Sequence, residues 1–269
     1  MNRVAKAYED ITFSCIEGSW IHGYYREFQK ELRWLGYHSI AAMQDTDHPH
    51  KDLDQHAQDL TDEEECAGLE NIVRFAHSSG FNIAVRNADH VMGIEAVASG
   101  ADPSTYRPSP EQYDLFSSRY SDDFDNGTVW PGPNARRSAK FLTMFRKTMA
   151  EAVFLDHSDG TRIDIDEDER RLLVQRLRPK RRHPEEPRLE GGLPDKLYAY
   201  FAMKYDSALN FNFEVNFARE VLGVEPVVME CGHTPMVESP KLMAELAVRE
   251  ALKFQARPTE VAAAYGNPG

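Results

Sequence analysis

The chain alternates between compact apolar runs and longer segments in which apolar residues recur at helical spacing. The compact runs have the length and composition of buried strands and lie at residues 11–16, 37–43, 72–75, 91–98, 196–203 and 225–230. Helical segments separate most of these runs along the chain. Strands that alternate with helices in this way predict a mostly parallel sheet with helices on its faces.

The helical segments carry recognisable end signals. Phe28 and Leu32 are spaced as on one face of a helix, and Gly36 is its expected end. Residues 52–66 read as an acidic surface helix, and residues 210–222 as a helix ended by the glycine that follows. A last helix is expected to begin at Ser239 or Pro240, with a loose tail after Arg257.

Between residues 102 and 194 this alternation is lost. Prolines break the first part of the segment, a helical pattern occupies residues 135–154, and opposed charge runs follow at 164–169 and 176–182. Charge runs of this kind usually form solvated faces. We expect residues 103–194 to form a helical cap insertion over the strand ends, and residues 1–102 and 195–269 to form the core. Aromatic residues of the cap belong either to its own core or to an apolar pocket wall.

Composition narrows the class of protein. A chain of 269 residues can bury one large α/β domain with an insertion. The net charge of -13 argues against nucleic acid and against an anionic membrane surface as partners. Neither a signal peptide nor an apolar run long enough to span a bilayer is evident. Cys15, Cys66 and Cys231 are odd in number and widely spaced, as expected of reduced thiols in a cytoplasmic protein.

A serine turn stands at the centre of the predicted sheet. The run at residues 72–75 passes through the sequence AHSSG, in which the small residues Ala76 and Gly80 flank Ser78, and a helix-compatible run continues to Asp89. A strand, a sharp turn on a serine and a helix form a nucleophile elbow, and the N-terminus of that helix favours negative charge. The alternative is an ordinary helix that is capped by its serine.

Two further residues favour the elbow. Asp206 and His233 each follow a predicted strand, on the edge of the sheet where Ser78 is expected. A serine hydroxyl becomes a good nucleophile when a neutral imidazole takes its proton and a carboxylate orients that imidazole. Singly, His233 is as well explained as a structural loop residue and Asp206 as a turn former. The chain order Ser, Asp, His favours a catalytic triad.

These motifs together resemble those of the α/β-hydrolases over nearly the whole chain. The AHSSG turn is similar to the G-x-S-x-G elbow of that superfamily, with Ala76 in the place of the first glycine. Residues 232–240 resemble its histidine loop and the start of its last helix, and residues 17–20 (EGSW) resemble its oxyanion loop, where many members carry His-Gly. Residues 20–25 and the short N-terminus are similar to the small esterases grouped with hydroxynitrile lyases and plant methylesterases. The resemblance implies an α/β-hydrolase fold with about six strands and a cap.

The resemblance also implies roles for particular residues. Ser78 would be the nucleophile, His233 the general base and then the acid, and Asp206 the group that orients His233. The backbone N–H groups of Ser19 and Ser79 would form the oxyanion hole. No metal and no organic cofactor is implied. His48 and His50 lie in a charged loop without a third ligand at metal spacing.

The residues expected to contact substrate are Glu17, Gly18, Trp20 and His77. Glu17 is the unusual member, because a carboxylate opposes negative charge at an oxyanion hole unless it points away, pairs with a cation such as Arg26, or is protonated. An outward-facing Glu17 without any role is an equal alternative.

Three functions fit this pattern. The first is hydrolysis of a carboxylic ester or lactone, a small-molecule substrate, through an acyl-serine intermediate. The second is a lyase that uses the triad for acid/base chemistry, as hydroxynitrile lyases do. That chemistry needs a cation in the pocket, and Thr234 and Pro235, not lysine, follow His233. The third is a ligand-binding protein on a hydrolase scaffold, and a homodimer is left open in each case.

Overall fold

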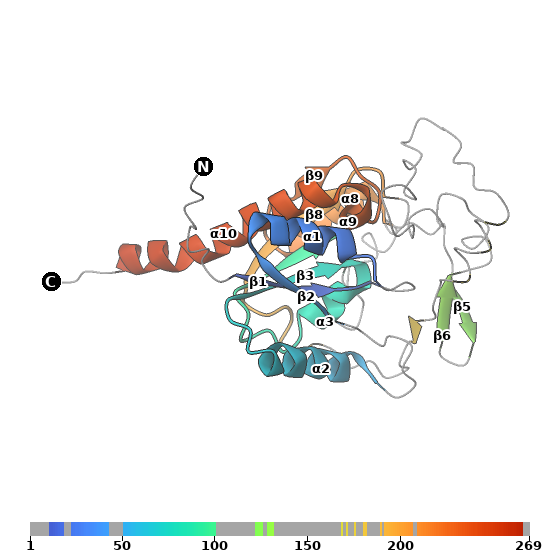
Figure 1. Ribbon diagram of the computed structural model, residues 1–269, viewed down its shortest axis with the longest axis horizontal. Helices are drawn as coiled ribbons and strands as arrows, with labels where there is room; N and C mark the ends of the chain where they lie inside the picture. Colours follow the sequence, from blue (N-terminus) through green and yellow to red (C-terminus); the bar gives the residue numbers. More distant parts are fainter. Residues whose placement is uncertain are drawn as a thin grey trace.

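The computed structural model describes residues 11–18, 23–42, 51–100, 191–206 and 209–265, with short pieces at 122–125, 128–131 and 180–181 and single residues at 168, 171, 175 and 189. Their centre is a six-stranded sheet in the order β2-β1-β3-β4-β8-β9, in which all neighbours run parallel (Figure 1). The strands are β1 (Thr12–Ile16), β2 (His38–Ala42), β3 (Ile72–His77), β4 (Gly93–Val97), β8 (Leu197–Met203) and β9 (Val227–Met229). Each coincides with an apolar run predicted above, so the predicted parallel sheet is confirmed.

Helices cover both faces of the sheet (Figure 1). One face packs against α1 (Arg26–Leu35) and α10 (Pro240–Tyr265), and the other packs against α2 (Leu53–Cys66), α3 (Phe81–Ala84) and α8 (Phe211–Asn216). Side chains along β3 alternate between the two hydrophobic cores on either face of the sheet. Val73 and Phe75 belong to the first core cluster, whereas Ile72 and Ala76 belong to the second. β3 therefore presents apolar side chains on both faces of the sheet, as parallel strands usually do.

The helix ends follow the signals in the sequence. Gly36 closes α1 in a left-handed conformation with φ 95°, which glycine adopts without a steric penalty. Asp52 caps α2, because its carboxylate accepts the N–H of Gln55 while the Gln55 side chain accepts the N–H of Asp52. The predicted acidic helix is thus confirmed, although Leu53 and Leu60 on it are buried.

Other boundaries differ from the prediction. After α8 the chain continues as a π-helical segment, Phe217–Val221, and ends at Gly223 with φ 68°. A separate helix, α9 (Pro235–Glu238), precedes α10, and α10 extends to Tyr265 where a loose tail was expected from Arg257. The alanines near its end are strong helix formers, which a search for apolar periodicity undervalues.

The predicted cap is described only in small part. It contributes β5 (Asp122–Asp125), β6 (Thr128–Pro131) and β7 (Lys180–Arg181), which form an antiparallel sheet in that order. The helical pattern at residues 135–154 lies outside the described residues, and the boundaries of the cap stay a prediction. Among the described residues, none of the helices is both long enough and apolar enough to span a membrane.

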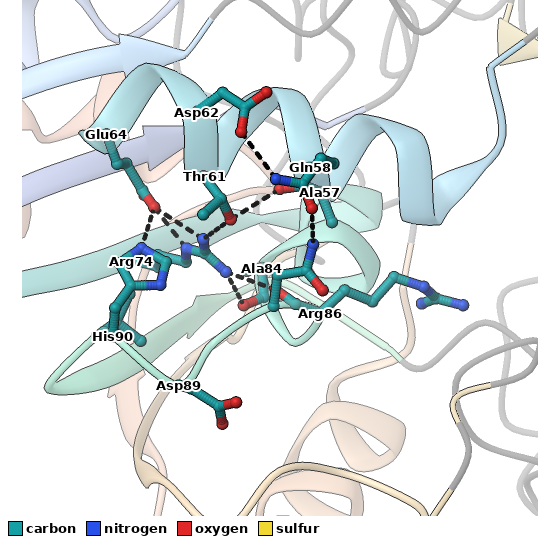
Figure 2. A network of polar contacts seen from close by, with 12 residues as sticks. Ala57, Gln58, Thr61, Asp62, Glu64, Arg74, Ala84, Arg86, Asp89 and His90 are labelled. Carbon is teal, nitrogen blue, oxygen red and sulfur yellow. Dashed lines mark hydrogen bonds and ion pairs between the residues drawn. The ribbon is translucent and has the colours of Figure 1, made fainter. Parts of the chain in front are cut away.

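A buried cation anchors α2 to the strand that leads to the serine turn. Arg74 on β3 and Glu64 on α2 are fully buried, and their side chains meet at 2.7 Å between Nη2 and Oε2 and at 3.2 Å between Nε and Oε1. Figure 2 shows the guanidinium between α2 and the segment after α3, where it donates to the carbonyls of Ala84 and Arg86 at 3.1 and 2.6 Å. The Thr61 hydroxyl accepts a further Arg74 N–H at 3.2 Å. This bonding satisfies a group that would be very costly to bury alone.

Candidate active site

Ser78 lies on a sharp turn at the carboxyl end of β3. His77 is still extended, with φ -101° and ψ 134°, and Ser78 then adopts φ 52° at the start of a 3-10 turn, Ser78–Gly80. A positive φ at a residue with a Cβ is strained, and such strain clusters at functional sites. Ser78 is half-buried, whereas His77 before it is buried. This is the backbone geometry of a nucleophile elbow.

Close packing explains the glycines around the turn. A Cβ on Gly80 would lie 2.5 Å from the Glu17 carbonyl oxygen, and a Cβ on Gly18 would lie 2.9 Å from the Ser78 Cβ. Both positions therefore require glycine. Ala76, which replaces a glycine of the motif, is fully buried and lies in register with Ile16. The methyl group at Ala76 is accommodated, as expected from its small size.

The helix after the turn is shorter than the sequence suggests. The run to Asp89 is helix-compatible, but α3 ends at Ala84 and Asn87 adopts φ 47°. The reason is tertiary, because Arg74 takes the carbonyls of Ala84 and Arg86 that a continued helix would have used. A dipole from this single turn contributes little at Ser78, and the N–H groups of the turn itself are the relevant donors.

Asp206 and His233 meet beyond the ends of β8 and β9. His233 Nδ1 lies 2.6 Å from Asp206 Oδ2, with both side chains almost fully buried. The other carboxylate oxygen of Asp206 accepts the N–H of Leu209 at 3.0 Å. Because Nδ1 donates to the carboxylate, Nε2 of a neutral His233 is left as an acceptor.

The histidine loop touches the serine turn directly. His77 Nε2 lies 2.8 Å from the carbonyl oxygen of His233, and the centroids of the two imidazole rings are 4.7 Å apart. Ser78, Asp206 and His233 are thus gathered at one edge of the sheet. Among the described residues no hydrogen bond joins Ser78 Oγ to His233, so the predicted triad would need one to form when substrate binds.

Glu17 turns back into its own loop. Its side chain is buried, and Oε1 accepts the N–H of Gly23 at 2.5 Å, while Arg26 is exposed. The alternative of an outward-facing Glu17 is therefore wrong. The carboxylate joins the two ends of the loop that begins at the end of β1, so its position is fixed by the loop backbone.

A second contact closes the same loop. The N–H of Gly18 donates to the hydroxyl of Tyr24 at 2.5 Å, and that hydroxyl lies 2.7 Å from His77 Nδ1. Both ring nitrogens of His77 and the N–H of Gly18 therefore have protein partners, although both residues were predicted to contact substrate. Ser19 and Trp20 lie outside the described residues, and Ser79, the other predicted oxyanion donor, is half-buried beside Ser78.

Solved structures with the same architecture are found by comparison of the whole fold. An extracellular α/β-hydrolase from a Paenibacillus species, related in structure and function to tobacco salicylic acid binding protein 2, matches with a TM-score of 0.59 and 18% identity over 89% of this chain and 98% of that chain. A methylesterase from Arabidopsis, MES16, matches with a TM-score of 0.61 and 14% identity over 91% of this chain and 99% of that chain. A variant of tomato methylketone synthase I, complexed with β-ketoheptanoate, matches with a TM-score of 0.63 and 12% identity over 93% of this chain and 100% of that chain.

The chain has the α/β-hydrolase fold. No protein-family model matches it, and no curated protein sequence matches it. The fold predicted from the resemblance is confirmed. The prediction rested on short motifs spread along the chain, whose sequence has low identity to the matched structures. At these identities the matches establish the architecture, and the chemistry has to be argued from this chain's own residues.

The candidate site carries two carboxyl groups that the sequence did not single out. Glu214 on α8 is fully buried, and its Oε2 accepts the N–H of Met203 at 3.0 Å. Burial, and then the charge of Asp206, raise the pKa of Glu214 well above its usual range. Burial therefore favours the protonated, uncharged form of Glu214. A glutamate in the first turn of an amphipathic helix gives no signal of this environment.

Glu238 on α9 secures the histidine loop, because its Oε2 accepts the N–H of Gly232 at 2.8 Å. Burial, with the charge of Asp206 adding to it, raises the pKa of Glu238 to about 7. The protein therefore contains a carboxyl group that titrates near neutrality, next to the loop that carries His233.

Replacing Glu238 with glutamine is expected to change how stability depends on pH. The native state holds the Glu238 proton more tightly than the unfolded state, so its contribution to stability is full below about pH 4.5 and is lost as pH rises to about 7. The difference in unfolding free energy between wild type and Glu238→Gln should fall over that window, by at most about 1.4 kcal/mol per pH unit, and stay level above it. Urea unfolding at a series of pH values measures this difference. A difference that does not vary with pH would contradict the assignment.

Proposed function

We propose that this protein hydrolyses a carboxylic ester or lactone through an acyl-serine intermediate, with Ser78, His233 and Asp206 as the triad. The observation that carries the proposal is the 2.6 Å hydrogen bond between His233 and Asp206 on a loop that is itself bonded to His77, the neighbour of Ser78. An imidazole oriented by a carboxylate near a serine on a strained turn is the arrangement that activates a hydroxyl.

The reaction follows from the proton positions. Ser78 Oγ attacks the carbonyl carbon while its proton passes to His233 Nε2, and the carbonyl electrons move onto oxygen. Collapse of this intermediate breaks the ester bond, and the leaving alkoxide takes the proton from His233. Water then attacks the acyl-serine and gives a proton to His233, which returns it to Ser78 as the carboxylic acid leaves.

Backbone N–H groups stabilise the oxyanion in this proposal. Ser79 directly follows the nucleophile on the 3-10 turn, and Ser19 follows Gly18, whose Cα lies against Ser78. Such donors are effective because they are fixed before the charge develops. The Asp206 carboxylate, bonded to His233 Nδ1, stabilises the imidazolium that forms in each half of the reaction.

The structural matches, the residues of the histidine loop and the bonded triad residues all favour hydrolysis of an ester. The structural matches include a methylesterase and pyrethroid hydrolases, which are named for hydrolytic activities. The residues after His233 are Thr234 and Pro235, so the histidine loop lacks the cation that the lyase alternative would need there. All three triad residues are retained and two of them are bonded to each other, which disfavours a purely ligand-binding role.

A test of the covalent intermediate separates these functions. Rapid mixing with p-nitrophenyl butyrate should release a burst of about one p-nitrophenolate per chain, because the acyl-enzyme accumulates when its hydrolysis is slower than its formation. Acid quench, proteolysis and mass spectrometry should then place a butyryl group on Ser78. Enzyme pretreated with a fluorophosphonate is the matched control, and it should show neither burst nor butyryl group.

Other outcomes would exclude the proposal. Release of p-nitrophenolate without an acyl group on Ser78 would remove the acyl-serine mechanism. Absence of both burst and turnover with acetate, butyrate and lactone substrates would favour the ligand-binding alternative. Cleavage of a cyanohydrin without any covalent adduct would favour the lyase.

A further inference from the structure

A chain of hydrogen bonds connects the three loops that meet at the site. It runs from the N–H of Gly18 to the Tyr24 hydroxyl at 2.5 Å, from that hydroxyl to His77 Nδ1 at 2.7 Å, and from His77 Nε2 to the carbonyl of His233 at 2.8 Å. Gly18 lies in the predicted oxyanion loop, His77 directly precedes Ser78, and His233 is the predicted general base. The side chains of Tyr24 and His77 are both about 3% exposed, so water does not compete for these bonds.

The donors and acceptors allow one arrangement of the protons when His77 is neutral. The carbonyl oxygen of His233 can only accept, so His77 Nε2 carries the imidazole proton. His77 Nδ1 is then an acceptor, and the Tyr24 hydroxyl must donate to it. The Tyr24 oxygen in turn accepts the N–H of Gly18. With the protons placed in this way, every polar atom in this series of hydrogen bonds has a partner, and no other placement achieves this.

Burial and the neighbouring histidine keep His77 in this form. Burial first, and then the charge of His233, lower the pKa of His77 well below its usual value, and the bond to the His233 carbonyl offsets this only in part. Burial and the charge of Glu17 raise the pKa of Tyr24 well above its usual value, so the phenol keeps its proton. The ring centroids of His77 and His233 are 4.7 Å apart. Because His77 is neutral, it does not repel the positive charge that His233 would take up during the proposed reaction.

We propose that Tyr24 and His77 are positioning residues, whose hydrogen-bond chain holds the Gly18 loop, the serine turn and the histidine loop at the spacing that acyl transfer requires. The inference rests on the proposed function and adds to it two residues that act through their neighbours and do not touch the substrate. It replaces the predicted substrate contact of His77 with an internal role. Gly18 shares this role, because its N–H is bound by Tyr24 and its Cα lies against Ser78.

Tyr24 and Tyr25 offer a matched pair of substitutions. Both are buried tyrosines, and their rings are 5.0 Å apart. The Tyr24 hydroxyl belongs to the series of hydrogen bonds from Gly18 to His233. The Tyr25 hydroxyl instead donates to the carbonyl of Ile16 at 2.9 Å. Tyr24→Phe and Tyr25→Phe therefore each remove one buried hydroxyl and should lose similar stability, but only Tyr24→Phe breaks the connection between the loops.

His77 offers a second pair. Leucine removes both hydrogen bonds, whereas glutamine can accept from Tyr24 through its amide oxygen and donate to the His233 carbonyl through its amide nitrogen. His77→Gln should therefore keep much of the activity that His77→Leu loses. This comparison separates hydrogen bonding from the volume of the side chain.

The experiment measures kcat and KM for p-nitrophenyl butyrate, the acylation burst and the melting temperature of wild type and all four variants. Tyr24→Phe and His77→Leu should lower kcat by about 10- to 100-fold, with KM within about threefold of wild type, because misplaced groups weaken the transition state more than substrate binding. Tyr25→Phe should keep kcat within about threefold despite a similar fall in melting temperature, and His77→Gln should recover most of the loss.

Contrary results are distinct from one another. A wild type that forms no acyl group on Ser78 overturns the proposed function and this inference with it. A wild-type burst together with an unchanged kcat in Tyr24→Phe overturns the inference alone. Equal losses of kcat in Tyr24→Phe and Tyr25→Phe, or in His77→Gln and His77→Leu, would assign these residues to general stability of the fold and would also overturn it.

Discussion

Ser78→Ala should lower kcat for an ester substrate by about a million-fold, and adding His233→Ala to it should cost little more. The serine oxygen and the imidazole act as one unit, so the rate is lost once either is missing. Steady-state kinetics on p-nitrophenyl butyrate with the single and double variants tests this expectation. Activity that remains in Ser78→Ala should come from the oxyanion donors and substrate binding alone.

The Asp206 position adds a graded comparison. Asp206→Asn removes the negative charge but keeps the shape of the side chain, and it should lower kcat by about ten-thousand-fold because His233 takes the wrong tautomer.

Ser99→Ala is the matched control for Ser78→Ala. Ser99 is a buried serine just after the neighbouring strand β4, where its hydroxyl donates to the Val97 carbonyl at 2.9 Å, and its loss should leave kcat within about threefold. Independent, additive losses at Ser78 and His233 would contradict a common mechanism.

Arg74→Met should destabilise the protein by about 3 to 5 kcal/mol, the largest stability effect expected of a single substitution among those considered. The change leaves Glu64 buried without its main cation, since both side chains are fully buried, and it releases the carbonyls of Ala84 and Arg86. Burial raises the pKa of Glu64, but the hydrogen bond and charge of Arg74 outweigh it, so the pKa is lowered overall. Equilibrium unfolding in urea measures the change in free energy.

Two variants make this prediction specific. Arg219→Met removes an exposed arginine that is paired with Glu225 at 2.9 Å, and it should cost less than about 1 kcal/mol. Combining Arg74→Met with Glu64→Leu should recover part of the loss, because no charge is then buried alone. Recovery should be incomplete, since His90 also bonds to Glu64 at 2.8 Å. An Arg74→Met variant as stable as Arg219→Met would show that the buried pair contributes nothing.

The pH dependence of the buried pair has the opposite sign to that of Glu238. A lowered pKa means that the unfolded state binds the proton more tightly, so the stabilisation from ionised Glu64 is present above about pH 4.5 and is lost as pH falls through its folded pKa. At acidic pH the cost of Arg74→Met should therefore shrink. The same series of urea titrations follows both groups.

The sequence by itself determined the fold class and the members of the candidate triad. Compact apolar runs mark the strands of the central sheet because a strand covered by helices on both faces is mostly apolar. Gly36 and Asp52 mark helix ends because a positive φ and a free N–H group each need a particular residue type. Ser78, Asp206 and His233 could be chosen because each follows a strand, and parallel strands bring their carboxyl ends to one edge.

Tertiary structure alone decided the orientation of Glu17, the length of α3 and the partners of Tyr24 and His77. Glu17 turns inward because an N–H of its own loop is available, α3 stops where Arg74 takes its carbonyls, and Tyr24 meets a histidine that lies 53 positions along the chain. Each of these contacts joins residues whose approach depends on how the strands and loops are assembled. Local patterns encode burial and helix ends, whereas the pairing of polar groups across loops exists only after the sheet has brought them together.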